Sequence, residues 1–165
     1  MSDPLDDLPP PSAGPASTPE PASAPPPEAP LRQMRLLGLH HVTLISRDLS
    51  ATTAFYRDAL GLTLVREGTN DDDPGVRHFW FGDPAGTPGT LVTFLEYPAM
   101  GQGTVGVGST HHLAFSVASS EELDAWRIHL EGRGVAPTEV LERGGLRSVY
   151  LRDPDGHVVE IVTPV

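Results

Sequence analysis

The stretch that decides the fold is Gly-Leu-His-His-Val-Thr-Leu at residues 38–44, because a second version of it recurs as Ser-Thr-His-His-Leu-Ala-Phe at residues 109–115. In both versions, two histidines open a short apolar run of the length and composition of a β-strand. The two stretches therefore begin two halves of a repeated unit.

The order of predicted elements is the same in both halves. The first half predicts a strand, a helix and three strands, near residues 38–46, 49–60, 62–68, 76–82 and 90–97. After a Gly-rich connection, the second half predicts the same series near residues 110–117, 120–131, 135–141, 146–152 and 157–163. Each half reads as one βαβββ module.

Spacing supports the duplication. His41 precedes Phe55 by 14 residues, and His112 precedes Trp126 by the same number. Arg-His-Phe-Trp-Phe-Gly-Asp-Pro at residues 77–84 aligns with Arg-Ser-Val-Tyr-Leu-Arg-Asp-Pro at residues 147–154. The strand after each Asp-Pro turn then places Thr93 opposite Glu160 in the alignment.

These motifs resemble the vicinal oxygen chelate superfamily, which includes glyoxalase I, fosfomycin-resistance proteins and extradiol ring-cleaving dioxygenases. The most specific stretches are residues 39–44, 55–62 and 148–161. The resemblance implies an α+β fold in which two βαβββ modules form a cupped mixed sheet, with a metal ion in the cup. It covers a domain at residues 34–165, with module one at about 36–98, a linker at 99–108 and module two at about 109–164.

Residues 1–33 have a different composition. Residues 1–30 contain 11 of the 18 prolines, five acidic residues and no basic residue. So few apolar side chains cannot offset the entropy lost on ordering, and we expect a disordered tail.

Charge and composition exclude several classes of function. The net charge of −11 disfavours nucleic acid as a partner, because phosphate binding needs a basic patch. The absence of Cys excludes disulfides, thiolate metal sites and a Cys nucleophile. With no export signal and no apolar run of membrane-spanning length, we expect a cytoplasmic protein without a membrane partner.

Two histidines and one carboxylate are the predicted metal ligands. His41 and His112 open the first strands of the two halves, and Glu160 lies on the last strand. If the modules pair by their pseudo-symmetry, the three side chains can form the facial set that leaves positions open on a divalent ion, typically Fe(II). The spacing in the superfamily favours the second member of each doublet as the ligand and leaves His111 as a structural residue.

The residue at position 93 distinguishes between the types of reaction that members of this superfamily catalyse, and here it is Thr93. Glyoxalase-like members carry a carboxylate or amide at this place, where it binds the metal and moves the substrate's proton. Threonine is a poor ligand and no base at neutral pH, so it favours a position open to a chelating substrate or O2. Glu96, three residues further on, is the alternative in a different register.

The first half further resembles ring-cleaving dioxygenases that act on hydroquinones and related phenols. That resemblance implies catalytic roles for His40 as acid or base, Thr43 beside the site, Arg143 on an anionic oxygen and Tyr150 as a hydrogen-bond donor. It also implies Fe(II), with Mn, Ni or Zn as alternatives, a phenolic or enediol substrate, O2 and a homodimer.

Three classes of function follow from these observations. The favoured one is an Fe(II)-dependent, extradiol-type ring-cleaving dioxygenase. The second is a glyoxalase-like isomerase, lyase or thiol transferase that uses another divalent metal. The third is a non-catalytic protein that binds a small molecule or drug, against which the three predicted ligands count.

Overall fold

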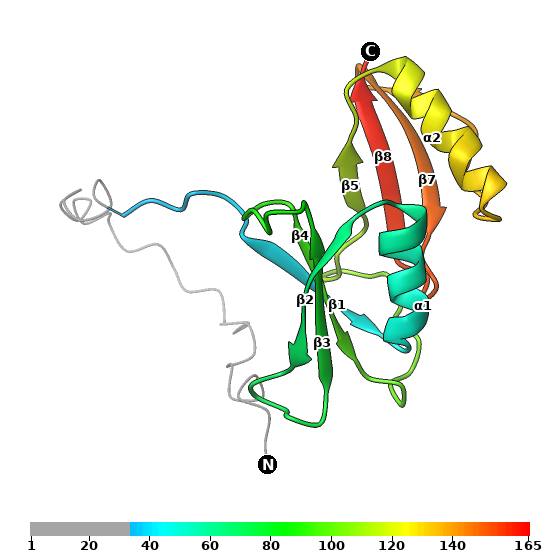
Figure 1. Ribbon diagram of the computed structural model, residues 1–165. Helices are drawn as coiled ribbons and strands as arrows, with labels where there is room; N and C mark the ends of the chain where they lie inside the picture. The colour runs from blue at the N-terminus through cyan, green and yellow to red at the C-terminus, as the bar shows by residue number, and fades with distance from the viewer. Residues whose placement is uncertain (1–33) are drawn as a thin grey trace, which may run out of the picture. The chain divides into compact units, whose positions relative to one another are not determined.

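The structure, a computed structural model, describes residues 34–165. It contains two four-stranded mixed sheets, whose strands lie between residues 41 and 164 (Figure 1). The tail predicted at residues 1–33 lies outside the described residues. Residues 38–165 form one compact unit. No helix among the described residues is long and apolar enough to span a membrane.

Module one contains the first sheet, whose strand order is β1-β4-β3-β2. Its β1 strand runs parallel to β4, and the other neighbours are antiparallel. Its elements are β1 (His41–Ser46), α1 (Leu49–Thr53), the π-helical turn η1 (Ala54–Ala59), β2 (Thr63–Thr69), β3 (Arg77–Gly82) and β4 (Leu91–Glu96).

Module two repeats this plan with the strand order β5-β8-β7-β6. Its β5 strand runs parallel to β8, as β1 does to β4. Its elements are β5 (Leu113–Ser116), α2 (Ser120–Gly132), β6 (Leu141–Arg143), β7 (Leu146–Arg152) and β8 (Val158–Pro164). The predicted α+β fold of two βαβββ modules is confirmed, and within this chain the modules form two separate sheets.

Two predicted elements differ in detail. The helix expected at residues 49–60 is α-helical only to Thr53, where the hydroxyls of Thr52 and Thr53 bond to carbonyl groups four residues earlier. Such bonds compete with the helix's own, and a π-helical turn follows in which Leu60 N donates to Phe55 O. The strand expected at residues 135–141 forms only at Leu141–Arg143.

The helix-facing sides of both sheets share one core. Phe94 and Phe81 from module one pack against Tyr56, whose ring centroid lies 4.7 Å from that of Phe94. From module two, Val149 and Leu130 belong to the same buried cluster. This core joins the modules through their helices, so the opposite face of each sheet, termed its open face, is left without a helix.

A buried carboxylate also connects the modules. The side chain of Asp153, which directly follows β7, is fully buried. Its Oδ2 accepts a hydrogen bond from Tyr56 Oη at 3.1 Å and lies 2.8 Å from His157 Nδ1. Its Oδ1 accepts from the backbone N–H groups of Asp155 and His157. The sequence analysis did not foresee this contact, because Tyr56 and Asp153 are 97 residues apart.

Candidate metal centre

The strand register confirms the alignment of Thr93 with Glu160. Trp80 on β3 pairs with Thr93 on β4, and Tyr150 on β7 pairs with Glu160 on β8. In the parallel pairs, Thr43 lies beside Thr93, and Ala114 lies beside Glu160. Each position of the open face in one module therefore has a counterpart in the other.

Module two holds a histidine and a carboxylate in contact. His112 Nε2 lies 3.0 Å from Oε2 of the buried Glu160. The other carboxylate oxygen, Oε1, accepts a hydrogen bond from Tyr150 Oη at 2.6 Å. The two oxygens of Glu160 are thus divided, one facing the histidine and one held by the phenol.

Tyr150 therefore directs its single hydroxyl hydrogen to Glu160. The carboxylate of Glu160 raises the pKa of the Tyr150 phenol above its usual value, while Ser148 and, to a smaller extent, the charge of Arg143 act in the opposite direction. Arg143 ends β6 and pairs with Leu146, which lies on the same face of β7 as Tyr150. The structure thus brings His112, Glu160, Tyr150 and Arg143 to one face of module two.

Module one holds the other predicted residues. The ring centroid of Trp80 lies 4.8 Å from that of His41 and 5.0 Å from that of His78. Thr43 Oγ1 accepts a hydrogen bond from Thr93 Oγ1 at 2.9 Å. His41 and Thr43 are exposed at the start of β1, and Thr93 is buried.

Glu96 does not share this face. Its Oε2 accepts a hydrogen bond from Arg77 Nε at 2.7 Å, and its Oε1 accepts from Leu49 N at the start of α1 at 2.9 Å. The Arg77 partner lowers the pKa of the Glu96 carboxyl. Because neighbours three positions apart on a strand point to opposite faces, Glu96 points to the helix side while Thr93 points to the open side.

The two histidine doublets have the same geometry. His40 Nδ1 lies 3.0 Å from His41 Nδ1, and His111 Nδ1 lies 2.9 Å from His112 Nδ1. The ring centroids are 5.2 Å apart in both pairs, and the rings are nearly perpendicular. In each doublet, Nδ1 of the first ring is within hydrogen-bonding distance of Nδ1 of the second ring. Nε2 of the second ring is therefore the nitrogen that is available to bind a metal ion.

This arrangement gives His111 the same place as His40. The sequence analysis left His111 as a structural residue, and side-chain alternation along a strand would indeed turn it away from His112. However, β5 begins only at Leu113, so alternation does not apply to the doublet. The repeat itself predicts this match, because both doublets stand at the first strand of a module.

The chain does not bring the predicted ligands together in one place. Among the described residues, no three His, Asp or Glu side chains cluster closely enough to hold a metal ion. His41 lies on the open face of one sheet, whereas His112 and Glu160 lie on the open face of the other. In a single chain the predicted ligands thus fall into two separate groups, termed half-sites.

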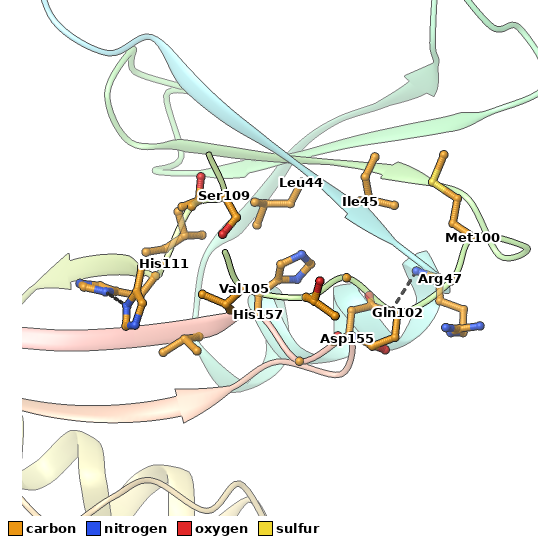
Figure 2. A pocket seen from close by; sticks show the side chains of 18 of the residues that line it. Leu44, Ile45, Arg47, Met100, Gln102, Val105, Ser109, His111, Asp155 and His157 are labelled. Carbon is orange, nitrogen blue, oxygen red and sulfur yellow. Dashed lines mark hydrogen bonds between the residues drawn. The ribbon is translucent and has the colours of Figure 1, made fainter. Parts of the chain in front are cut away.

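A cavity of about 450 Å³ lies where the modules meet (Figure 2). It is lined by parts of β1, the connection between β4 and β5, and the turn before β8, and it includes Thr43 and His112 but neither His41 nor Glu160. In Figure 2, His111 lies at one end, and Arg47, Gln102 and Asp155 lie at the other. Arg47 N donates to Asp155 Oδ1 at 3.0 Å, and Oδ2 of Asp155 is buried without a partner among the described residues.

The donor atoms suit a divalent metal ion. Two ligands that each lie about 2.1 Å from one ion at a right angle are about 3.0 Å apart. The contact of 3.0 Å between His112 Nε2 and Glu160 Oε2 matches that separation. Tyr150 and His111 hold the remaining atoms of both side chains, as hydrogen-bonding neighbours of metal ligands commonly do.

Comparison with known proteins now assigns the class. A family model described as the Glyoxalase/Bleomycin resistance protein/Dioxygenase superfamily matches residues 38–161, and the chain belongs to this superfamily.

Among individual relatives, the chain is 45% identical over 106 residues to MhqE of Bacillus subtilis, a protein whose name assigns it provisionally to the ring-cleaving dioxygenases. This match covers 64% of the chain and 35% of MhqE. The chain is also 32% identical to a chlorohydroquinone/hydroquinone 1,2-dioxygenase of Sphingobium indicum, over 73% of the chain and 38% of that protein. The chain thus spans little more than a third of the length of these relatives.

Solved structures of proteins with related names also resemble this chain. A protein from Bacillus subtilis that is provisionally named a dioxygenase superposes with a TM-score of 0.72 at 37% identity, over 76% of this chain and 40% of that one. The fosfomycin resistance protein FosX of Listeria monocytogenes, in a variant complexed with Mn(II) and a dihydroxypropylphosphonic acid, gives a TM-score of 0.58 at 26% identity. That match covers 77% of this chain and 92% of FosX.

Proposed function

We propose that this protein is a ring-cleaving dioxygenase that uses Fe(II) and O2 to open a small phenolic compound such as a hydroquinone. The contact between His112 and Glu160 on the open face of module two carries the proposal, because it supplies two of the three ligands of a facial triad. The names of the two relatives described above support ring cleavage as the reaction. Thr93 in place of a second carboxylate disfavours the glyoxalase-like alternative.

The third ligand in this proposal is His41 of a second copy. Within one chain the helices join the modules, and the half-sites lie on separate open faces. Among the described residues, β1 and β5 each pair with a single strand, so both sheets end in a free edge beside a histidine doublet. Pairing module one of one copy with module two of another would complete two identical sites by two-fold symmetry.

The residues around the site have separate tasks in this proposal. A bound Fe(II) would supply Lewis acidity toward the phenolic oxygens and a place for O2. Tyr150 orients Glu160, while His111 and His40 orient the rings of His112 and His41. His40 is exposed, and because its Nδ1 accepts from the N–H of a liganded His41, its own hydrogen lies on Nε2, from which it can give a proton to the substrate and take it back. Arg143 attracts an anionic oxygen.

Metal content is the first test. Protein purified without air is expected to carry about one iron per chain, and the His41→Ala, His112→Ala and Glu160→Ala variants are expected to lose it. His129→Ala is the matched control, because His129 is on α2 and bonds to the carbonyl oxygen of Ala59. Uptake of O2 with hydroquinones or catechols then tests the reaction. Nickel or zinc at the same level, with turnover in the absence of O2, would favour the glyoxalase-like alternative.

Mixing two inactive variants tests whether the site is shared. In a mixed dimer of His41→Ala and Glu160→Ala chains, one site carries both changes and the other carries neither. Random exchange of a 1:1 mixture is therefore expected to restore about a quarter of the normal activity per site. No recovery, with exchange of subunits verified independently, would contradict the shared site and leave the metal assignment to the first test.

A further inference from the structure

We propose that His78 is a positioning residue that turns the hydroxyl hydrogen of Thr43 toward the open face of module one, where it donates to a phenolic oxygen of the substrate. This role rests on the proposed function for the identity of the substrate. The arrangement of the side chains that would produce it is present in the chain by itself.

The three side chains involved lie on neighbouring strands. His78 on β3, Thr93 on β4 and Thr43 on β1 form a line across the sheet. His78 Nε2 lies 3.0 Å from Thr93 Oγ1, which lies 2.9 Å from Thr43 Oγ1. Thr93 is fully buried in the middle, whereas Thr43 is exposed at the edge of the sheet.

The angles at the two hydroxyl oxygens favour one direction along this line. Between the two hydroxyl groups, Thr93 is the donor and Thr43 the acceptor. A hydroxyl group has only one hydrogen, so Thr93 must accept, rather than donate, in its contact with His78. Nε2 of His78 therefore carries a hydrogen, and the hydrogen of Thr43 remains unused by either neighbour.

The opposite tautomer of His78 would reverse the direction of the hydrogen bonds between these side chains. If Nε2 were bare, Thr93 would donate to it and could no longer donate to Thr43. Thr43 would then direct its own hydrogen back to Thr93 and away from the open face. Burial lowers the pKa of the half-buried His78 ring, and the charge of Arg66 acts in the same direction. Both effects favour the neutral ring, which is the state in which the tautomer matters.

Module two shows why a donor is useful here. At the places of His78, Thr93 and Thr43, module two has Ser148, Glu160 and Ala114, according to the strand register. One module thus presents a carboxylate acceptor, and the other presents a hydroxyl donor at the corresponding place. A phenolic oxygen that gains negative charge is stabilised by the donor.

The tautomer can be measured without metal, substrate or turnover. Nitrogen-15 NMR of the histidine side chains at neutral pH is expected to show His78 with hydrogen on Nε2 and none on Nδ1, with His78→Gln identifying the signals. Hydrogen on Nδ1 alone, or on both nitrogens, would overturn the proposal.

A double-mutant cycle tests whether His78 acts through Thr43. With hydroquinone as the probe under nitrogen, His78→Leu is expected to raise the Kd by about 3- to 10-fold, and Thr43→Val by a similar factor. His78→Leu added to Thr43→Val is expected to change the Kd no further. His78→Gln keeps a side-chain N–H donor and should restore most of the affinity.

Additive effects in this cycle would overturn the proposal, because a merely structural role of His78 would weaken binding whether or not Thr43 has a hydroxyl. Failure of the wild-type protein to bind hydroquinone would also overturn it. Tight binding with the expected cycle but no consumption of O2 in air would instead contradict the proposed function alone.

Discussion

Thr93 and Glu160 occupy the same position in the two sheets, each beside an aromatic residue on the neighbouring antiparallel strand. Glu160 faces a histidine and accepts a hydrogen bond from a phenol, whereas Thr93 lies between another histidine and another hydroxyl. The duplicated module has thus produced two unlike halves, one suited to hold a cation and one suited to donate a hydrogen bond.

Loss of the Tyr150 hydroxyl should weaken metal binding. In Tyr150→Phe, Oε1 of Glu160 loses its hydrogen bond and the carboxylate is free to rotate. Such neighbours of ligands typically contribute about 10- to 100-fold in metal affinity. Competition with a chelating dye would measure the change, with Tyr97→Phe as the control for a tyrosine on the other module. Unchanged affinity would mean that packing alone orients Glu160.

Replacement of Glu96 should affect stability and leave metal content unchanged. Its carboxylate accepts from Leu49 N at the start of α1 and pairs with Arg77, so Glu96→Ala should lower the free energy of unfolding by about 1–2 kcal/mol. Urea unfolding and elemental analysis of the same samples would check both parts. Glu67→Ala, at an exposed position on β2, is the control. Loss of metal in Glu96→Ala would make Glu96 a ligand after all.

The bond between Tyr56 and Asp153 should stabilise the union of the modules. Tyr56→Phe leaves a fully buried carboxylate with one donor fewer, which should cost about 1–3 kcal/mol of unfolding free energy. Burial and the Asp153 carboxylate raise the pKa of the Tyr56 phenol well above its usual value, so it remains a donor throughout the neutral range. Urea unfolding would measure the loss, with Tyr97→Phe as the matched control. A change below about 0.5 kcal/mol would contradict this role.

His157 should make stability depend on pH. Its hydrogen bond to Asp153 raises the pKa of the His157 ring above the ordinary value, despite partial burial. The stabilising contribution is therefore fully present below the unfolded pKa of about 6.5, and it is lost as the pH rises through the folded pKa.

The comparison of wild type with His157→Asn isolates this contribution, because the other histidines are common to both proteins. The difference in unfolding free energy should be larger at pH 6 than at pH 8.5. An equal difference at both values would show that the charged form of His157 contributes nothing beyond the neutral one.

The sequence could predict the features that depend on the duplicated module and on the periodic pattern of apolar residues. Alignment of the two halves of the sequence predicts the fold, the position of Thr93 opposite Glu160 and the histidine doublets. The contact of His78 with Thr93 could not be predicted, because it depends on how β3 and β4 are aligned across 15 residues of sequence.

The separation of the half-sites was equally beyond reach of the sequence. It depends on which surfaces of the modules pack together, and the contacts that decide this, such as Tyr56 with Asp153, join residues far apart in the chain. The shortened strand β6 reflects local chemistry, since Pro137 has no N–H to give to a neighbouring strand.

Because the proposed ligands are distributed over two sheets, the number of complete sites depends on the concentration of the chain. The site proposed above needs two copies and so would exist only in the associated state, where its occupancy would follow the law of mass action. Well below the dissociation constant of the dimer, the number of complete sites falls with the square of the chain concentration. Dilution would then lower the number of complete sites per chain without any change in the folded modules, and a cell that doubles its supply of this chain would more than double the number of complete sites.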